Sequence, residues 1–171
     1  MALMKTYAFI DASNIIYGTR DEGWKVDFKK LFKYLKERYK CKKIYYFAGK
    51  DKKNPKQHNF YKKLSYFGYE LILKPVKFYK QDNGRIIRKA NCDVDLTFYA
   101  MRDKDLFNRA IFLTGDGDFE VLFKYFILQK KEVVVIANGK RTAREIRILM
   151  GPNFTPIKSL QSVIRYRNKK G

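Results

Sequence analysis

Five aspartates lie in unusually apolar or glycine-rich surroundings, which makes them the first candidates for chemistry. They are Asp11, Asp93, Asp95, Asp116 and Asp118. Carboxylates about 4 Å apart repel by about 4 kcal/mol per pair at an effective dielectric constant of about 20. Aspartates that a fold gathers in one place therefore either share protons or bind a hard cation.

The ligand types indicate which cation to expect. Oxygen ligands favour Mg²⁺ or Mn²⁺. A zinc site is not supported, because His58 is the only histidine and the two cysteines, Cys41 and Cys92, lack CxxC spacing. A divalent cation in a basic groove can activate water and stabilise the transition state of phosphoryl transfer.

The elements that must position these aspartates alternate along the chain. Apolar runs predict strands over residues 7–10, 44–48, 69–74, 110–114 and 133–137. Amphipathic spacing and capping residues predict helices over residues 28–39, 55–67, 93–102, 118–129 and 142–149. Residues 154–157 fit a short edge strand. Such alternation implies a mostly parallel sheet with helices on both faces.

The aspartates follow the predicted strands. In a parallel sheet the site lies beyond the carboxyl ends of the strands. Asp11 follows the first strand, Asp116 and Asp118 follow the fourth, and Asp93 begins the helix that leads into the fourth. We therefore expect these carboxylates to converge at one edge of the sheet.

Each aspartate also has a purely structural interpretation. Asp11 can accept hydrogen bonds from loop amides, Asp93 or Asn91 can cap a helix, and Asp118 can cap the helix after a glycine-rich turn. Convergence at the predicted strand ends favours the functional interpretation. Asp95 lies two residues along a helix from Asp93 and points elsewhere, so its role stays open.

The composition narrows the class of protein. The chain has 171 residues, and 38 Lys and Arg against 17 Asp and Glu give a net charge of +21 with a pI of about 9.9. This charge predicts a polyanionic partner, with nucleic acid ahead of an anionic membrane surface. The alternative is that a lysine-rich composition reflects the host proteome or its growth temperature.

The same composition bears on location and organisation. No apolar run reaches the roughly 18 residues of a membrane span, and the apolar start before Asp11 is too short for a signal peptide. Two distant cysteines fit a reducing cytoplasm. We expect one domain over residues 1–160, a hairpin insertion at about 76–88 and a basic tail at 161–171; the sequence leaves the oligomeric state open, a homodimer included.

Basic residues are expected to line the same edge as the acids. A cluster follows the second predicted strand, namely Lys50, Lys52, Lys53 and Lys56. The hairpin, marked by Asn83-Gly84 at its turn, carries Phe78 and Tyr79 among Lys77, Lys80, Arg85, Arg88 and Lys89. Basic residues contact phosphates and exposed aromatic rings stack unpaired bases, so the hairpin is the predicted substrate clamp. The alternative is that both rings pack onto the body of the protein.

Three segments resemble those of a known family. The segment Phe9-Ile10-Asp11-Ala12-Ser13-Asn14 resembles the (F/I)-(I/V)-D-x-x-N opening of the NYN domain family, a branch of the PIN-like nucleases. Residues 89–96 are similar to its K-G-N-x-D-V-(E/D)-L segment, and residues 113–119 to its (S/T)-G-D-G-D-F segment. The three occur in the family's order, and the resemblance covers roughly residues 5–157.

The resemblance implies a PIN-like, three-layer α/β/α fold with a mostly parallel five-stranded sheet in the order 3-2-1-4-5. It implies Mg²⁺- or Mn²⁺-dependent cleavage of RNA, with metal ligands at Asp11, Asp93 and Asp116 and with Asp118 beside them. Asn14 would orient an acid or the substrate phosphate. Ala90 stands where the family usually has Gly. This difference could affect the backbone conformation of that turn, but it removes no metal ligand. The candidate substrate-binding residues are Ser13, Lys50, Lys80, Arg85, Lys89, Thr114 and Arg144.

Three classes of function compete. A metal-dependent endoribonuclease leads, and an RNA-binding module with a weak or inactive metal site is the alternative, against which the intact acids argue. A phosphatase of the haloacid-dehalogenase type needs D-x-D after its first strand, and this chain has Ser13 at the second aspartate position. A glycine-rich phosphate loop after the first strand is absent, which excludes Rossmann and P-loop nucleotide binding.

Overall fold

A computed structural model describes residues 3–168 and centres on one parallel sheet of six strands. In the order β3-β2-β1-β6-β7-β8 these are Glu70–Pro75, Cys41–Lys50, Thr6–Asp11, Arg109–Leu113, Glu132–Ala137 and Phe154–Pro156. The first five follow the predicted order 3-2-1-4-5, but the predicted number of five strands is wrong. The sixth strand, β8, pairs in parallel with β7. It is the short edge strand that was expected over residues 154–157, here Phe154–Pro156, which the predicted five-strand order left out.

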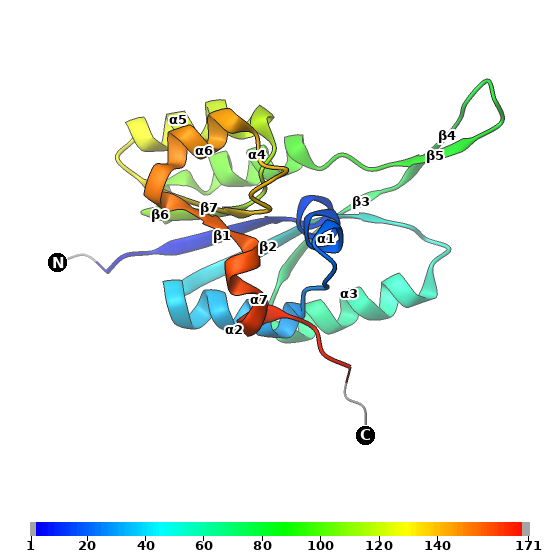
Figure 1. Ribbon diagram of the computed structural model, residues 1–171, viewed down its shortest axis with the longest axis horizontal. Coiled ribbons are helices and arrows are strands. Elements are labelled where there is room, and N and C mark those ends of the chain that lie inside the picture. Colours follow the sequence, from blue (N-terminus) through cyan, green and yellow to red (C-terminus); the bar gives the residue numbers. More distant parts are fainter. Residues whose placement is uncertain (1–2, 169–171) are drawn as a thin grey trace.

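Helices cover both faces of the sheet (Figure 1). On one face lie α1 (Ala12–Asp21), α2 (Phe28–Tyr39), α3 (Pro55–Phe67) and α7 (Gln161–Ile164); on the other lie α4 (Asp93–Arg102), α5 (Glu120–Leu128) and α6 (Arg144–Met150). Successive side chains of a strand point to opposite faces, so Ala8 and Ile10 of β1 pack with the first set and Tyr7 and Phe9 with the second. Among residues 3–168, no helix is long and apolar enough to cross a membrane.

Helix α1 begins directly after β1, where the sequence had indicated no element. Asp11 is its N-cap and accepts a hydrogen bond from the amide of Asn14 at 3.4 Å. Ile15 packs into the core, and Gly18 lies where an added Cβ would stand 3.1 Å from Cβ of Asn138. The helix therefore depends on tertiary packing, because Gly and Asn are weak helix formers in isolation.

The first residues of the predicted basic tail pack onto the domain. Ile164 of α7 is fully buried, and its carbonyl accepts a hydrogen bond from the amide of Asp27 at 2.8 Å. The amide of Tyr166 bonds to the carbonyl of Lys25. The domain thus includes residues beyond 160, while residues 169–171 of that tail lie outside the described residues.

The predicted hairpin forms a separate two-stranded sheet that stands away from the body (Figure 1). Its strands are β4 (Lys77–Lys80) and β5 (Ile86–Lys89), and Gly84 adopts a positive φ of 79° in the turn. Phe78 and Tyr79 are 54% and 52% exposed. The interpretation that both rings pack onto the body is therefore wrong.

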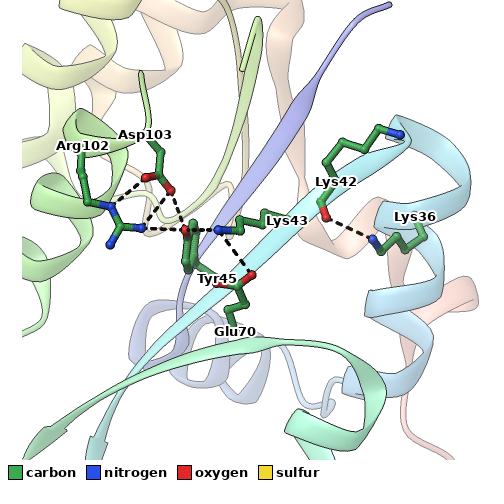
Figure 2. Close-up of polar contacts among 7 residues, drawn as sticks. All are labelled: Lys36, Lys42, Lys43, Tyr45, Glu70, Arg102 and Asp103. Atoms are coloured by element: carbon green, nitrogen blue, oxygen red, sulfur yellow. Dashed lines mark hydrogen bonds and ion pairs between the residues drawn. The ribbon is translucent and has the colours of Figure 1, made fainter. Parts of the chain in front are cut away.

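A buried polar network fixes the end of α4 that lies at the amino edge of the sheet (Figure 2). Asp103, which follows α4, accepts a hydrogen bond from the hydroxyl of Tyr45 at 2.5 Å and one from Nε of Arg102 at 2.7 Å. Burial opposes ionisation of Asp103, but the hydrogen bonds from Arg102 and Tyr45 outweigh it and lower its pKa. Lys43 adds a hydrogen bond to Tyr45 at 3.2 Å. The network therefore ties the C-terminal end of α4 to β2.

Candidate metal centre and basic cleft

Three aspartates meet at the carboxyl edge of the sheet. Asp116 and Asp118 follow β6, and Asp93 is the first residue of α4. Each offers a carboxylate oxygen that lies within 4.8 Å of the oxygens offered by the other two. The convergence expected from the strand ends is therefore present in the fold.

Asp11 lies next to this group but is held differently. Its Oδ2 accepts a hydrogen bond from the hydroxyl of Thr114 at 3.1 Å, while Oδ1 caps α1. Burial raises the pKa of Asp11 to about 6, and the charges of Asp93 and Asp116 act in the same direction. Asp11 thus caps a helix and also lines the site, so its two interpretations are compatible. Its place among the metal ligands stays a prediction.

The loop that carries Asp116 is held by a hydrogen bond to α1, by one within the loop and by the close approach of one glycine. The amide of Gly115 donates to Oδ1 of Asn14 at 3.1 Å, and the amide of Asp118 donates to Oδ1 of Asp116 at 3.0 Å. A Cβ on Gly115 would stand 2.3 Å from the hydroxyl and 2.9 Å from the Cα of Thr142. Only glycine permits this close approach. The side chain of Asn14 therefore positions the loop that carries Asp116 by binding the backbone amide of Gly115.

Asp93 presents its carboxylate from the first turn of α4. Oδ1 of Asn91 accepts a hydrogen bond from the amide of Asp93 at 2.8 Å, while the N-cap residue, Cys92, makes no side-chain capping bond. Burial raises the pKa of Asp93, the hydrogen bond involving Asn91 opposes this, and the charges of Asp116 and Asp118 raise it further. Asn91 thus binds the first amide of α4, and the metal-ligand role of Asp93 stays a prediction.

The turn before α4 also accommodates Ala90, where the family usually has Gly. Ala90 is not among the residues with positive φ. A Cβ on Gly49 would stand 2.7 Å from Cβ of Ala90, so the glycine at position 49 leaves the room that Ala90 needs.

Lys74 is a residue of this site that the sequence did not indicate. It lies on β3, and its ammonium donates to the carbonyl of Asn91 and to Oδ2 of Asp95, each at 3.1 Å. Asp95 therefore forms an ion pair with this lysine and is not in the group of three, as expected from its position two residues after Asp93. Lys74 and Asp95 together hold the segment that carries Asp93. No sequence pattern indicated this ion pair, because Lys74 and Asp95 are 21 residues apart in the chain.

If the site cleaves RNA, as the family resemblance implies, Lys74→Ala should lower the rate by roughly ten- to a hundredfold, because misplacing a catalytic group by about 1 Å has effects of this size. Lys74→Arg should recover part of the loss, since it keeps the charge and can donate to the same two oxygens. Initial rates at saturating Mn²⁺ measure the effect. Lys62→Ala, on the exposed surface of α3, is the matched control. Equal rates for Lys74→Ala and Lys62→Ala would contradict the positioning role.

A cleft of about 970 Å³ opens over the acids. Asp11, Asp93 and Asp116 line it, together with Ser13, Asn14, Tyr17 and Arg20 of α1, Arg88, Lys89 and Ala90 at the base of the hairpin, and Arg141. Of the predicted substrate-binding residues, Ser13 and Lys89 therefore lie in the cleft.

The other predicted substrate-binding residues lie elsewhere. Thr114 is fully buried, and its hydroxyl donates a hydrogen bond to Asp11. Lys50 lines a separate small depression, and Lys80, Arg85 and Arg144 are exposed but do not line the cleft. Arg20 and Tyr17 were missed, although Ser13, Tyr17 and Arg20 have the i, i+4, i+7 spacing of one helix face.

The donor set fits a hard divalent cation. Asp93, Asp116 and Asp118 offer only carboxylate oxygens. Among the residues that the structure describes, none of the three forms an ion pair with Lys or Arg. Unpaired carboxylates this close repel one another, and Mg²⁺ and Mn²⁺ prefer such oxygen ligands.

The fold is thus a parallel α/β sheet with a group of aspartates at its carboxyl edge. Residues 5–155 match the NYN domain model, and the chain therefore belongs to the NYN domain family. It is 27% identical over 144 residues to the low amplitude and bright protein LabA of Synechococcus elongatus (strain ATCC 33912 / PCC 7942 / FACHB-805), in an alignment that covers 81% of this chain and 76% of LabA. The family resemblance predicted from the three motifs is confirmed.

A solved structure shares the fold. The crystal structure of a protein of unknown function from Vibrio parahaemolyticus RIMD 2210633 superposes with a TM-score of 0.79 at 23% sequence identity. The superposition covers 97% of this chain and 100% of that chain. The α/β architecture is therefore common to both proteins.

Proposed function

We propose that this protein is a Mg²⁺- or Mn²⁺-dependent endoribonuclease that hydrolyses RNA phosphodiester bonds at the carboxyl edge of its sheet. The observation that carries the proposal is the group of Asp93, Asp116 and Asp118 in a chain of net charge +21. Nuclease chemistry is usual in the NYN family. The free cysteines fit a reducing compartment such as the cytoplasm.

In this proposal the residues of the cleft divide into two groups. Asp93, Asp116 and Asp118 would hold the cation, with Asp11 beside them, and a divalent cation there would supply activation of water and neutralisation of charge at the phosphate. Arg20, Lys89 and Arg141 line the same cleft and would contact the phosphates on either side of the scissile bond.

Thr114 and Asn14 hold Asp11 and the loop that carries Asp116 in position through hydrogen bonds. The hydroxyl of Thr114 and the amide of Asn14 hydrogen-bond to the two oxygens of Asp11, and the side chain of Asn14 holds the amide of Gly115. Because these bonds fix the carboxylates before substrate binds, little reorganisation is needed at the moment of reaction.

Metal removal tests the proposal directly. We expect the purified protein to cleave single-stranded or structured RNA with Mn²⁺ or Mg²⁺. Excess EDTA should lower the rate by at least about a hundredfold, because the cation supplies several kcal/mol of stabilisation to the transition state. Adding Mn²⁺ back in excess of the chelator should restore the rate. Undiminished cleavage in EDTA would contradict the metal mechanism, and RNA binding without any cleavage would favour the inactive RNA-binding module.

A further inference from the structure

The hairpin and its flanking residues, 76–90, form an arm that exposes apolar side chains to solvent on both of its faces. All eight residues of β4 and β5 are exposed, among them Phe78, Tyr79, Ile86 and Ile87. In the antiparallel register Phe78 lies opposite Arg88, Tyr79 opposite Ile87, and Lys80 opposite Ile86. Partners in such a ladder share one face of the sheet. One face therefore carries Tyr79 and Ile87, and the other carries Phe78 and Ile86.

This exposure is unusual for a segment that has no packed core of its own. An isolated two-stranded hairpin is marginally stable in water. The arm nevertheless presents four large apolar side chains, each at least 40% exposed. Such a segment is better suited to contact a ligand than to stabilise the domain.

The base of the arm joins the cleft that holds the acids. Arg88 and Lys89 line this cleft together with Asp93 and Asp116. The guanidinium of Arg88 binds Oδ2 of Asp51 at 2.9 Å, and the Asp51 side chain is only 15% exposed. Arg88 also lies over the ring of Phe78, at 5.7 Å from its centroid. The ion pair therefore fastens the arm to the body, and a polymer bound in the cleft can continue along the arm.

The charge of the arm indicates what it binds. Residues 76–90 contain five basic residues and a single acid, Asp82. A second copy of the arm would bring like charges together, which disfavours a contact between copies. Exposed rings set among cations match single-stranded nucleic acid, whose phosphates contact the cations and whose unpaired bases stack on the rings. The bases of a duplex are stacked on one another and are not available to these rings.

We propose that the arm binds a single-stranded segment of the RNA that enters the cleft, with bases stacked on Phe78 and Tyr79. The proposal rests on the proposed function, because it takes RNA as the ligand. It adds a specificity for single strands that the acidic site does not itself supply.

The test measures binding to uncleaved RNA. The background is Asp116→Asn in the full chain, and the probes are a fluorescein-labelled oligouridylate of about twelve nucleotides, within the site sizes of single-strand binders, and an RNA duplex of the same length. Phe78→Ala/Tyr79→Ala should weaken oligouridylate binding by about tenfold or more, as expected for the loss of stacking. Duplex binding should change much less. Tyr66→Ala, at a residue that is 89% exposed near the C-terminal end of α3, is the matched control.

A second pair of variants tests the charges. Lys80→Ala/Arg85→Ala should reduce the slope of log affinity against log salt for oligouridylate by about 1.4, because each phosphate contact on a single strand contributes about 0.7. Lys29→Ala/Lys33→Ala, which removes the same charge from the exposed face of α2, should leave the slope unchanged. Melting temperatures close to that of the background show that each variant is folded.

The outcomes separate the arm from the rest of the proposal. If the background protein binds oligouridylate and the ring variant binds equally well, the arm proposal is wrong while the RNA ligand stands. If neither the parent protein in EDTA nor the Asp116→Asn background binds RNA, both proposals fail. If sedimentation shows a dimer that the ring variant alone converts to a monomer, with RNA affinity unchanged, the arm is an interface between copies and the inference is overturned.

Discussion

Asp116→Asn is expected to abolish RNA cleavage while leaving the affinity for RNA without added metal unchanged or higher. Asp116 belongs to the group whose oxygens lie within 4.8 Å of one another, and a carboxylate near the scissile phosphate repels it unless a cation intervenes. Removing the charge should prevent the cation from binding. The cation supplies several kcal/mol of transition-state stabilisation, so its loss should lower the rate by at least about a hundredfold. The basic residues that supply affinity are untouched.

The structure makes this substitution a clean test. Oδ1 of Asp116 caps the following turn by accepting the amide of Asp118, and an asparagine oxygen can accept the same hydrogen bond. Cleavage is measured in Mn²⁺, and affinity by anisotropy in EDTA. Asp105→Asn, at an exposed carboxylate that lines no part of the cleft, is the control. If a well-folded Asp116→Asn protein loses both binding and cleavage, the acids belong to an RNA-reading surface or to a structural metal site, and the nuclease proposal is contradicted.

Asp11→Asn is expected to abolish cleavage and at the same time to stabilise the metal-free protein near neutral pH. Burial raises the pKa of Asp11 from 3.8 to about 6. The folded protein therefore holds this proton at a pH where the unfolded chain has released it, so stability falls as the pH rises from about 4 through 6. Two pKa units correspond to at most about 3 kcal/mol. Asparagine carries no charge and avoids this penalty.

Urea unfolding in EDTA measures the effect. At about pH 4, where Asp11 is largely protonated in the folded state, parent and variant should differ little; at about pH 7.5 the variant should be more stable. Asp93 also has a raised pKa and contributes a trend of the same sign in both proteins, so the difference between the two isolates Asp11. Mn²⁺ should stabilise the parent more than the variant. A stability difference that does not depend on pH would contradict the explanation.

Much of the site could be predicted from the sequence because its parts are local. The helix over 55–67 and the helix over 93–102 begin and end as predicted, since a capping residue or acid at the start and a glycine or basic residue at the end are read within one element. The aspartates were placed at one edge because parallel strands share their carboxyl ends. Sequence patterns of this kind report what each segment does on its own.

Pairings between distant segments could not be predicted in this way. Helix α1 forms because Ile15 packs into the core and Gly18 meets Asn138, which is 120 residues further along. The short edge strand expected over residues 154–157 is β8, but its parallel pairing with β7 was not specified by the sequence. Lys74 reaches Asp95 across the site through the pairing of β3 with the sheet.

The sequence by itself determined that an NYN-type parallel sheet brings acids to one edge of a strongly basic protein. The tertiary structure alone decided which acids come closest. Asp118 joins Asp93 and Asp116 because its amide turns the loop onto Asp116, while Asp11 is drawn toward Thr114 and the start of α1. It also decided that Phe78 and Tyr79 stay exposed on the arm. Local patterns specify which residues lie at a strand end, but hydrogen bonds between segments far apart in the chain set the distances on which the chemistry depends.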